Sequence, residues 1–156
     1  MLDRVMSRYE GYAPLALRIA VGLIFMAHGA QKLFGVFGGY GISGTAQFFE
    51  QTGIVPGTFW AVVVGLVEFA GGLAVLLGLF TRYAAALLAV DMLVAILMVH
   101  LPNGFFLPNG FEYAFALLGA SLTLVMSGAG ALALDRHLAR WWRGGQTRKH
   151  PTEAAA

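Results

Sequence analysis

Residues 57–100 decide the fold of this chain, and they read GTFWAVVVGLVEFAGGLAVLLGLFTRYAAALLAVDMLVAILMVH. Two long apolar runs occupy this stretch, separated by a short hinge at residues 79–83. A helix rises about 1.5 Å per residue, so roughly 20 residues cross a hydrocarbon core of about 30 Å. Because the hinge leaves room only for a tight turn, we predict two antiparallel membrane-spanning helices over residues 57–80 and 83–101.

Two further apolar runs flank this hairpin. One begins at Pro14, which suits a first helical turn because the N–H that proline lacks would have no partner there. It continues to Phe34 without a convincing cleavage site, so we interpret it as a retained anchor. The other covers residues 111–130. We therefore predict an all-α, integral membrane four-helix bundle within residues 1–134, with its first span at 14–34.

The composition indicates that lipid is the surrounding solvent. Hydrophobic residues make up 58% of the chain and charged residues 12%, against about 25% charged residues in soluble domains. The net charge of +2 does not indicate a nucleic-acid partner, because the basic residues gather at the ends of the runs and in the C-terminal tail. The chain has no cysteine, which excludes thiolate metal sites and iron–sulfur ligation. We expect no metal.

The positive charges predict the orientation of the bundle, because Lys and Arg near the ends of spans are retained on the cytoplasmic side. Lys32 lies on one predicted side of the membrane. The other basic residues lie on the opposite side: Arg4, Arg8, Arg18, Arg82, Arg136, Arg140, Arg143, Arg148 and Lys149. We therefore predict cytoplasmic N and C termini. Residues 135–156 are predicted to form a basic helix on the membrane surface and then a disordered tail.

Two loops lie on the predicted outer side. Residues 35–57 are rich in glycine and enclose a segment at 45–51 that we expect to form about one or two helical turns. Phe48 and Phe49 of this segment are expected to dip into the membrane interface. Residues 101–112 contain Pro-Asn-Gly twice, which predicts two consecutive turns.

Ionisable side chains inside the predicted spans need a physical reason, because each costs about 2.5–3.5 kcal/mol at the bilayer centre. Glu68 and Asp91 both fall near the midplane, where they either share a proton or sit protonated in separate helix interfaces. His28 lies about 9 Å below the outer edge, and Lys32 is one turn further out. His28 and Glu68 come into contact, directly or through a water, if their helix faces meet. Hydrogen-bonded helix packing is the alternative for each residue.

Glycines share the faces of these polar residues. Gly65 and Gly72 flank Glu68 on its own helix, and Gly22 and Gly29 lie on the first span. Small residues let another helix, or a flat ligand, approach closely. Both interpretations, plain helix packing and a ligand cleft, remain open at this point.

Polar residues also gather at the outer ends of the third and fourth spans, and they are His100, Asn103, Asn109, Glu112 and Tyr113. A site that opens outward is the economical interpretation.

Three further expectations concern Asp91, His100 and Arg18. Asp91 and His100 are nine residues apart, about 180° around an ideal helix, so we expect them to face different surroundings. Arg18, on the inner part of the first span, is a candidate to reach Asp91 as a structural ion pair. Axial haem ligation by His28 and His100 is a minor alternative.

Five short strings stand out when the chain is taken as a whole. They are residues 28–35 (HGAQKLFG), 68–72 (EFAGG), 78–82 (GLFTR), 100–106 (HLPNGFF) and 110–113 (GFEY). In this order and spacing, across about residues 13–135, the chain resembles the DoxX family of small bacterial membrane proteins. The resemblance implies a multi-pass protein of the bacterial inner membrane. It also implies a redox connection, since relatives include DoxD, the small membrane subunit of thiosulfate:quinone oxidoreductase.

On this resemblance we expect a membrane subunit of an oxidoreductase system, with quinone as the candidate cofactor. His28 and Glu68 are then the candidate catalytic residues, and the quinone-binding set is His28, Lys32, Glu68, His100 and Glu112. A redox protein would supply electrons, with the basic C-terminal segment as a candidate docking surface, and a homodimer is a further candidate assembly. The alternatives are a non-catalytic membrane scaffold or anchor and a small proton-coupled carrier. The sequence alone does not decide whether the chain is an enzyme.

Overall fold

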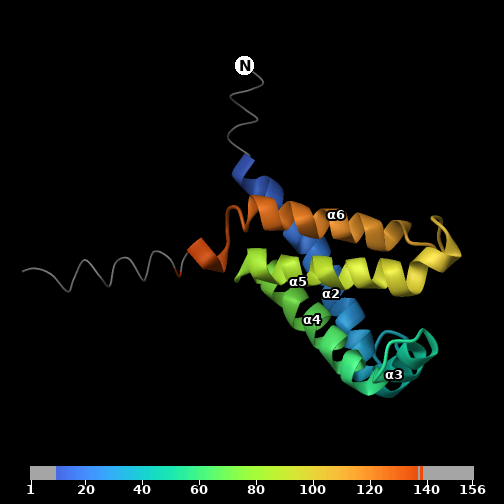
Figure 1. The fold of residues 1–156 in the computed structure, drawn as a ribbon. Helices are drawn as coiled ribbons and strands as arrows, with labels where there is room; N and C mark the ends of the chain where they lie inside the picture. Colours follow the sequence, from blue (N-terminus) through green and yellow to red (C-terminus); the bar gives the residue numbers. More distant parts are fainter. Residues whose placement is uncertain (1–9, 137, 139–156) are drawn as a thin grey trace, which may run out of the picture.

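The computed structural model describes residues 10–136 and 138, and all regular structure in this part is helical (Figure 1). The all-α prediction is therefore confirmed. The main helices are α2 (Ala13–Phe34), α3 (Gly41–Gln51), α4 (Gly57–Leu77), α5 (Thr81–Ala95) and α6 (Glu112–Ser127). A 3-10 turn, η1 (Glu10–Tyr12), precedes α2, while a π-helical turn, η2 (Ile96–His100), and a 3-10 turn, η3 (Leu101–Asn103), follow α5.

Three stretches are long and apolar enough to cross a membrane: the 22 residues of α2, the 21 residues of α4 and the 23 residues of Thr81–Asn103. The apolar helix α6 has 16 residues and ends at Ser127, so it is about 24 Å long. A span of that length meets a typical bilayer by local thinning or with help from its flanking residues. The cytoplasmic placement of both termini remains a prediction. The predicted surface helix and tail over residues 135–156 fall almost entirely outside the described residues.

The helices form two pairs that diverge from one end. Helix α2 packs along α4, and α5 packs along α6. Figure 1 shows α4 and α5 meeting at their shared corner and spreading apart toward the opposite end. We call the end at the α4–α5 corner the closed end and the other the open end. Helix α3 packs on α4 and lies at the open end.

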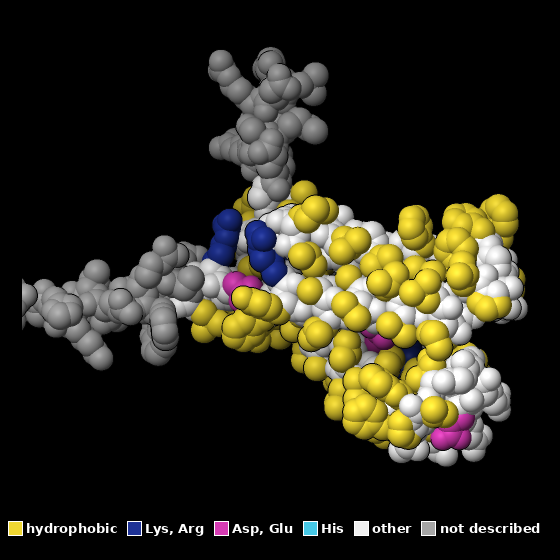
Figure 2. Space-filling model, in the orientation of Figure 1, with side chains coloured by type: hydrophobic (Ala, Val, Ile, Leu, Met, Phe, Trp, Pro, Cys, Tyr) yellow, Lys and Arg dark blue, Asp and Glu magenta, His cyan; other side chains and the backbone are white. Residues whose placement is uncertain are grey.

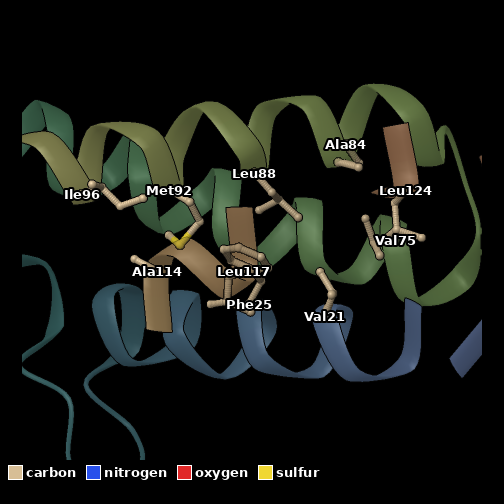
Figure 3. Close-up of a cluster of buried hydrophobic side chains, with 11 residues drawn as sticks. Val21, Phe25, Val75, Ala84, Leu88, Met92, Ile96, Ala114, Leu117 and Leu124 are labelled. Carbon is tan, nitrogen blue, oxygen red and sulfur yellow. The ribbon is translucent and has the colours of Figure 1, made fainter. Parts of the chain in front are cut away.

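The core lies between the two helix pairs (Figure 3). Phe25 of α2 and Leu117 of α6 meet below Leu88 of α5, and Val75 of α4 completes the cluster near the closed end. Phe25, Leu88 and Val75 are almost fully buried. The core therefore holds all four long helices together, and it extends along α5 from Ala84 near the closed end to Ile96.

Backbones of α2 and α4 approach each other through the glycines. A Cβ at Gly29 would lie 2.8 Å from the carbonyl oxygen of Gly65, and one at Gly72 would lie 2.8 Å from that of Gly22. Contacts this short allow no side chain at these positions. The helix-packing interpretation of these glycines is confirmed, and α2 occupies the face of α4 that a flat ligand would need.

Arg18 does not form the expected ion pair with Asp91. Its side chain is only 1% exposed, and its guanidinium donates hydrogen bonds to backbone carbonyls at the end of α4 and in the segment after α6. The four acceptors are the carbonyl oxygens of Val75, Leu76, Ala129 and Ala131. Backbone carbonyls therefore supply the hydrogen-bond acceptors that the structure shows for Arg18. The expectation was wrong because it considered side-chain partners only.

Helix α3 is longer than the short segment expected at residues 45–51, since it begins at Gly41. Phe49 packs with Ala46 and Ala61 in a small cluster between α3 and α4, whereas Phe48 stays exposed. The expectation that both phenylalanines face the membrane interface was therefore wrong for Phe49. The cluster fixes α3 against α4 at the open end.

We predict that Gly29→Ala destabilises the protein by about 1–3 kcal/mol, because the new methyl group would collide with the backbone of α4. The midpoint of thermal unfolding in mild detergent measures the effect. The matched control is Gly119→Ala on α6, where a Cβ meets nothing within 4 Å. Equal unfolding midpoints for the two variants would contradict the close approach of α2 and α4.

Candidate functional site

A buried ion pair joins α2 to α4 inside the membrane-spanning region. Lys32 Nζ lies 2.6 Å from Glu68 Oε2, and the Glu68 side chain is only 4% exposed. Lys32 reaches inward from the last turn of α2, which lets its stem lie along apolar surface while its ammonium group meets the carboxylate. The sequence suggested His28 as a partner of Glu68. The partner that the structure provides is Lys32.

Asp91 of α5 adds a second carboxyl to this pair. The Asp91 and Glu68 carboxyls border the same cavity and interact with each other. A hydrogen bond between them forms only when one of them holds a proton, because a carboxylate has no donor. Asp91 Oδ2 is buried and receives no hydrogen bond from any other group in the described residues. We call Lys32, Glu68 and Asp91 the charged cluster; it draws one residue from each of α2, α4 and α5.

The charged cluster lies at the wall of a cavity of about 810 Å³ between the two helix pairs. Figure 2 shows acidic and basic surface at the bottom of the hollow between the α5–α6 pair and the α3–α4 part, with hydrophobic surface around it. Most lining residues are apolar and come from α3, α4, α5, η2 and α6. The polar and ionisable lining residues are His28, Lys32, Glu68, Asp91, His100 and Tyr113.

The two histidines enter the cavity from different helices. The His28 ring packs against that of Tyr113, with ring centroids 6.3 Å apart. His100 Nδ1 lies 3.0 Å from the carbonyl oxygen of Asn109. A carbonyl can only accept, so Nδ1 donates this bond and Nε2 is left for another partner. Both rings therefore have fixed neighbours while bordering the cavity.

His100 and Asp91 line the same cavity, so the expectation that they face different surroundings was wrong. The cause is the π-helical turn at Ile96–His100, which lies between them. A π turn holds more residues than an α turn, so each residue advances less than 100° around the axis. The count of 180° assumed an ideal α-helix throughout.

Glu112 does not border the cavity, although it was predicted to bind the cofactor. Its Oε1 accepts a hydrogen bond of 2.8 Å from the backbone N–H of Leu107. It thereby fastens the loop with the second Pro-Asn-Gly to the start of α6. The other four predicted cofactor-binding residues, His28, Lys32, Glu68 and His100, all line the cavity.

These features define a class: a multi-pass membrane protein whose helices enclose a cavity with a buried charged cluster at its wall. The family within that class is identified by comparison. The DoxX family model matches residues 13–101, and the chain belongs to the DoxX family. The resemblance to the DoxX family is thereby confirmed.

Curated relatives place the family in bacterial membranes. A Bacillus subtilis protein with the name "Putative oxidoreductase CatD" is 36% identical over 78% of this chain and 83% of its own length. An uncharacterized membrane protein of Mycobacterium tuberculosis is 36% identical over 81% of each chain. The inner membrane protein YqjF of Escherichia coli is 32% identical over 88% of this chain and 100% of its own length. No solved structure matches the chain significantly. The predicted location in the inner membrane, with several spans, is confirmed.

Some lining residues had no strong signal in the sequence. Trp60 and Val63 of α4 looked like ordinary apolar positions, and Phe48 and Phe49 looked like interface anchors. Tyr113 was visible only as one member of the polar rim. Which face of a lipid-embedded helix lines a cavity depends on its neighbours, because lipid and protein interior favour the same apolar residues.

We predict that removing one partner of the Lys32–Glu68 ion pair destabilises the protein more than removing both partners together. Lys32→Met or Glu68→Gln alone leaves one partner buried, which is expected to cost about 3 kcal/mol in stability. The double variant Lys32→Met, Glu68→Gln is expected to lose clearly less than the sum. Thermal unfolding in detergent gives the coupling energy of this double-mutant cycle. Additive losses would show that the two side chains do not interact, and Glu50→Gln, on the exposed face of α3, is the control for losing a carboxylate.

Proposed function

We propose that this protein is the membrane subunit of an oxidoreductase system and that it binds quinone in the cavity. One observation carries the proposal: a buried charged cluster borders a large, mainly apolar cavity. An ionisable group inside a membrane is costly and is normally retained for a function or for a specific partner. The relative named as an oxidoreductase supports the redox part of the proposal.

The residues present fit a quinone. Its ring oxygens are acceptors, and Lys32, His28 and the Tyr113 hydroxyl are donors on the cavity wall. Its isoprenoid tail is apolar, as are the walls contributed by α4 and α5. Most small-molecule sites are apolar with a few placed polar groups and occupy about 300–1,000 Å³, and the cavity of about 810 Å³ lies within that range. A bound quinone supplies chemistry that no side chain has, since it accepts electrons together with protons.

The charged cluster contains groups that can hold a proton and donate it to a ligand. With both carboxyls ionised and Lys32 charged, the cluster would carry a net charge of −1 in a medium that disfavours charge. A proton shared by Glu68 and Asp91 would make the cluster neutral. Glu68 and Asp91 would therefore hold a proton at the cavity wall, and Lys32 would hold the remaining carboxylate in place. His28 offers a second site for proton transfer on the same wall.

The test measures quinone bound to the purified protein. We expect the wild type, purified in mild detergent, to carry quinone detectable by mass spectrometry or to bind added ubiquinone-1. Glu68→Gln should lower binding about tenfold or more, because it removes the carboxylate that positions the Lys32 donor at the cavity wall and the proton shared with Asp91.

Two tryptophan variants of α4 test quinone binding by steric blocking, without changing any charge. Val63 borders the cavity, whereas Leu66 on the same helix does not. Val63→Trp should therefore block quinone, and Leu66→Trp should leave binding unchanged. Quinone absent from folded wild type at saturating concentration, or bound equally by both tryptophan variants, would overturn the proposal.

A further inference from the structure

A second hollow lies at the closed end, away from the charged cluster. It has a volume of about 720 Å³ and borders the α4–α5 corner, the end of α6 and the segment that follows. Its ionisable residues are Arg82, Asp135 and Arg136. Figure 2 shows basic side chains on both sides of acidic surface at this end of the molecule.

Asp135 cancels only part of the positive charge of the hollow, and both of its oxygens are engaged by backbone. Oδ1 accepts from the N–H of Phe80 at 2.8 Å, and Oδ2 accepts from the N–H of Thr81 at 3.2 Å. These donors lie at the N-terminus of α5, whose dipole favours a negative charge. Counting Arg82, Arg136 and Asp135, the hollow keeps a net charge of +1.

Two donors at this hollow lack partners in the described part of the chain. Arg82 is exposed and makes no hydrogen bond or ion pair there. Thr81, which is 1% exposed, has a buried hydroxyl oxygen without a hydrogen-bond partner. Buried polar groups normally have partners, so the unpaired Thr81 hydroxyl is unusual, whereas the exposed Arg82 guanidinium next to it in the chain is available to a ligand. A phosphate oxygen is an acceptor that suits both.

The residues around the hollow indicate which kind of phosphate group would bind there. Phe80 and Tyr83 border the hollow and are 63% and 76% exposed. Exposed aromatic residues at the end of a span sit at the level of the lipid headgroups. A ligand in this hollow therefore meets guanidinium groups and an aromatic, lipid-facing rim together, which suits a lipid headgroup better than a soluble anion.

We propose that this hollow binds the phosphate of an anionic phospholipid from the leaflet at the closed end. Arg82 and Thr81 are the donors, Arg136 adds positive charge, and Phe80 with Tyr83 contacts the glycerol and upper acyl region. Basic pockets between membrane helices are known sites for acidic headgroups. The site is separate from the cavity and does not depend on quinone binding.

The experiment measures lipid retention by native mass spectrometry on delipidated, folded protein titrated with phosphatidylglycerol or with phosphatidylcholine of the same chains. We expect one phosphatidylglycerol to bind about tenfold more tightly than phosphatidylcholine. Arg82→Gln should remove most of this preference, and Thr81→Val, which keeps the shape of the side chain, should weaken it. Arg143→Gln, which removes the same charge from the chain outside the described residues, is the control and should keep the preference.

Three outcomes would overturn the proposal. Equal retention of both lipids by the wild type would indicate unspecific lipid around the helices. Phosphatidylglycerol bound with unchanged preference by both Arg82→Gln and Thr81→Val would place its site elsewhere. Full displacement of the lipid by millimolar inorganic phosphate would identify a site for soluble anions. The comparison of the two lipids in wild type and the Thr81→Val variant keep the test valid even if Arg82→Gln fails to fold.

Discussion

The hydrogen bonds of Arg18 are the interaction on which the shape of the bundle depends. A buried guanidinium must satisfy its donors, and Arg18 does so on backbone carbonyls at the end of α4 and after α6. One side chain of α2 therefore ties three parts of the chain together. Because this end is fixed, divergence of the two helix pairs opens the cavity between them toward the other end. The cavity is a consequence of where the bundle is fastened.

The glycine contact between α2 and α4 determines which polar groups meet. With Gly29 against Gly65 and Gly22 against Gly72, the register of the two helices leaves no freedom to slide. In that register the last turn of α2 lies beside Glu68, so Lys32 reaches the carboxylate. Asp91 arrives from α5, which the tight corner at residues 78–80 holds next to α4. Backbone packing thus comes first, and the charged cluster follows from it.

Much of the fold follows from the sequence, because a helix that crosses the bilayer must be apolar over a known length. The apolar runs predicted the helices, and Gly22, Gly29, Gly65 and Gly72 correctly indicated close packing. The partners of Arg18 and Glu68 did not follow, since they depend on which helix faces meet and on backbone carbonyls that every residue has. The shared cavity of Asp91 and His100 was missed because no residue pattern indicates a π turn within an apolar run. Glu112 was assigned to the site from its position in the chain, whereas its side chain holds a local turn.

The hydrogen bonds and the packed core at the closed end also help to decide between two functions, a carrier and a protein that binds a lipid-soluble cofactor. A carrier exposes its site to each side of the membrane in turn, usually by rocking one part against another. In this bundle such a motion would break the hydrogen bonds of Arg18 to four carbonyls and open a core that is almost fully buried at Val75 and Leu124. Leaving those groups unpaired in lipid would cost several kcal/mol. A ligand that arrives through the bilayer and stays beside the charged cluster needs no such motion. The fold therefore favours a cofactor site over alternating access.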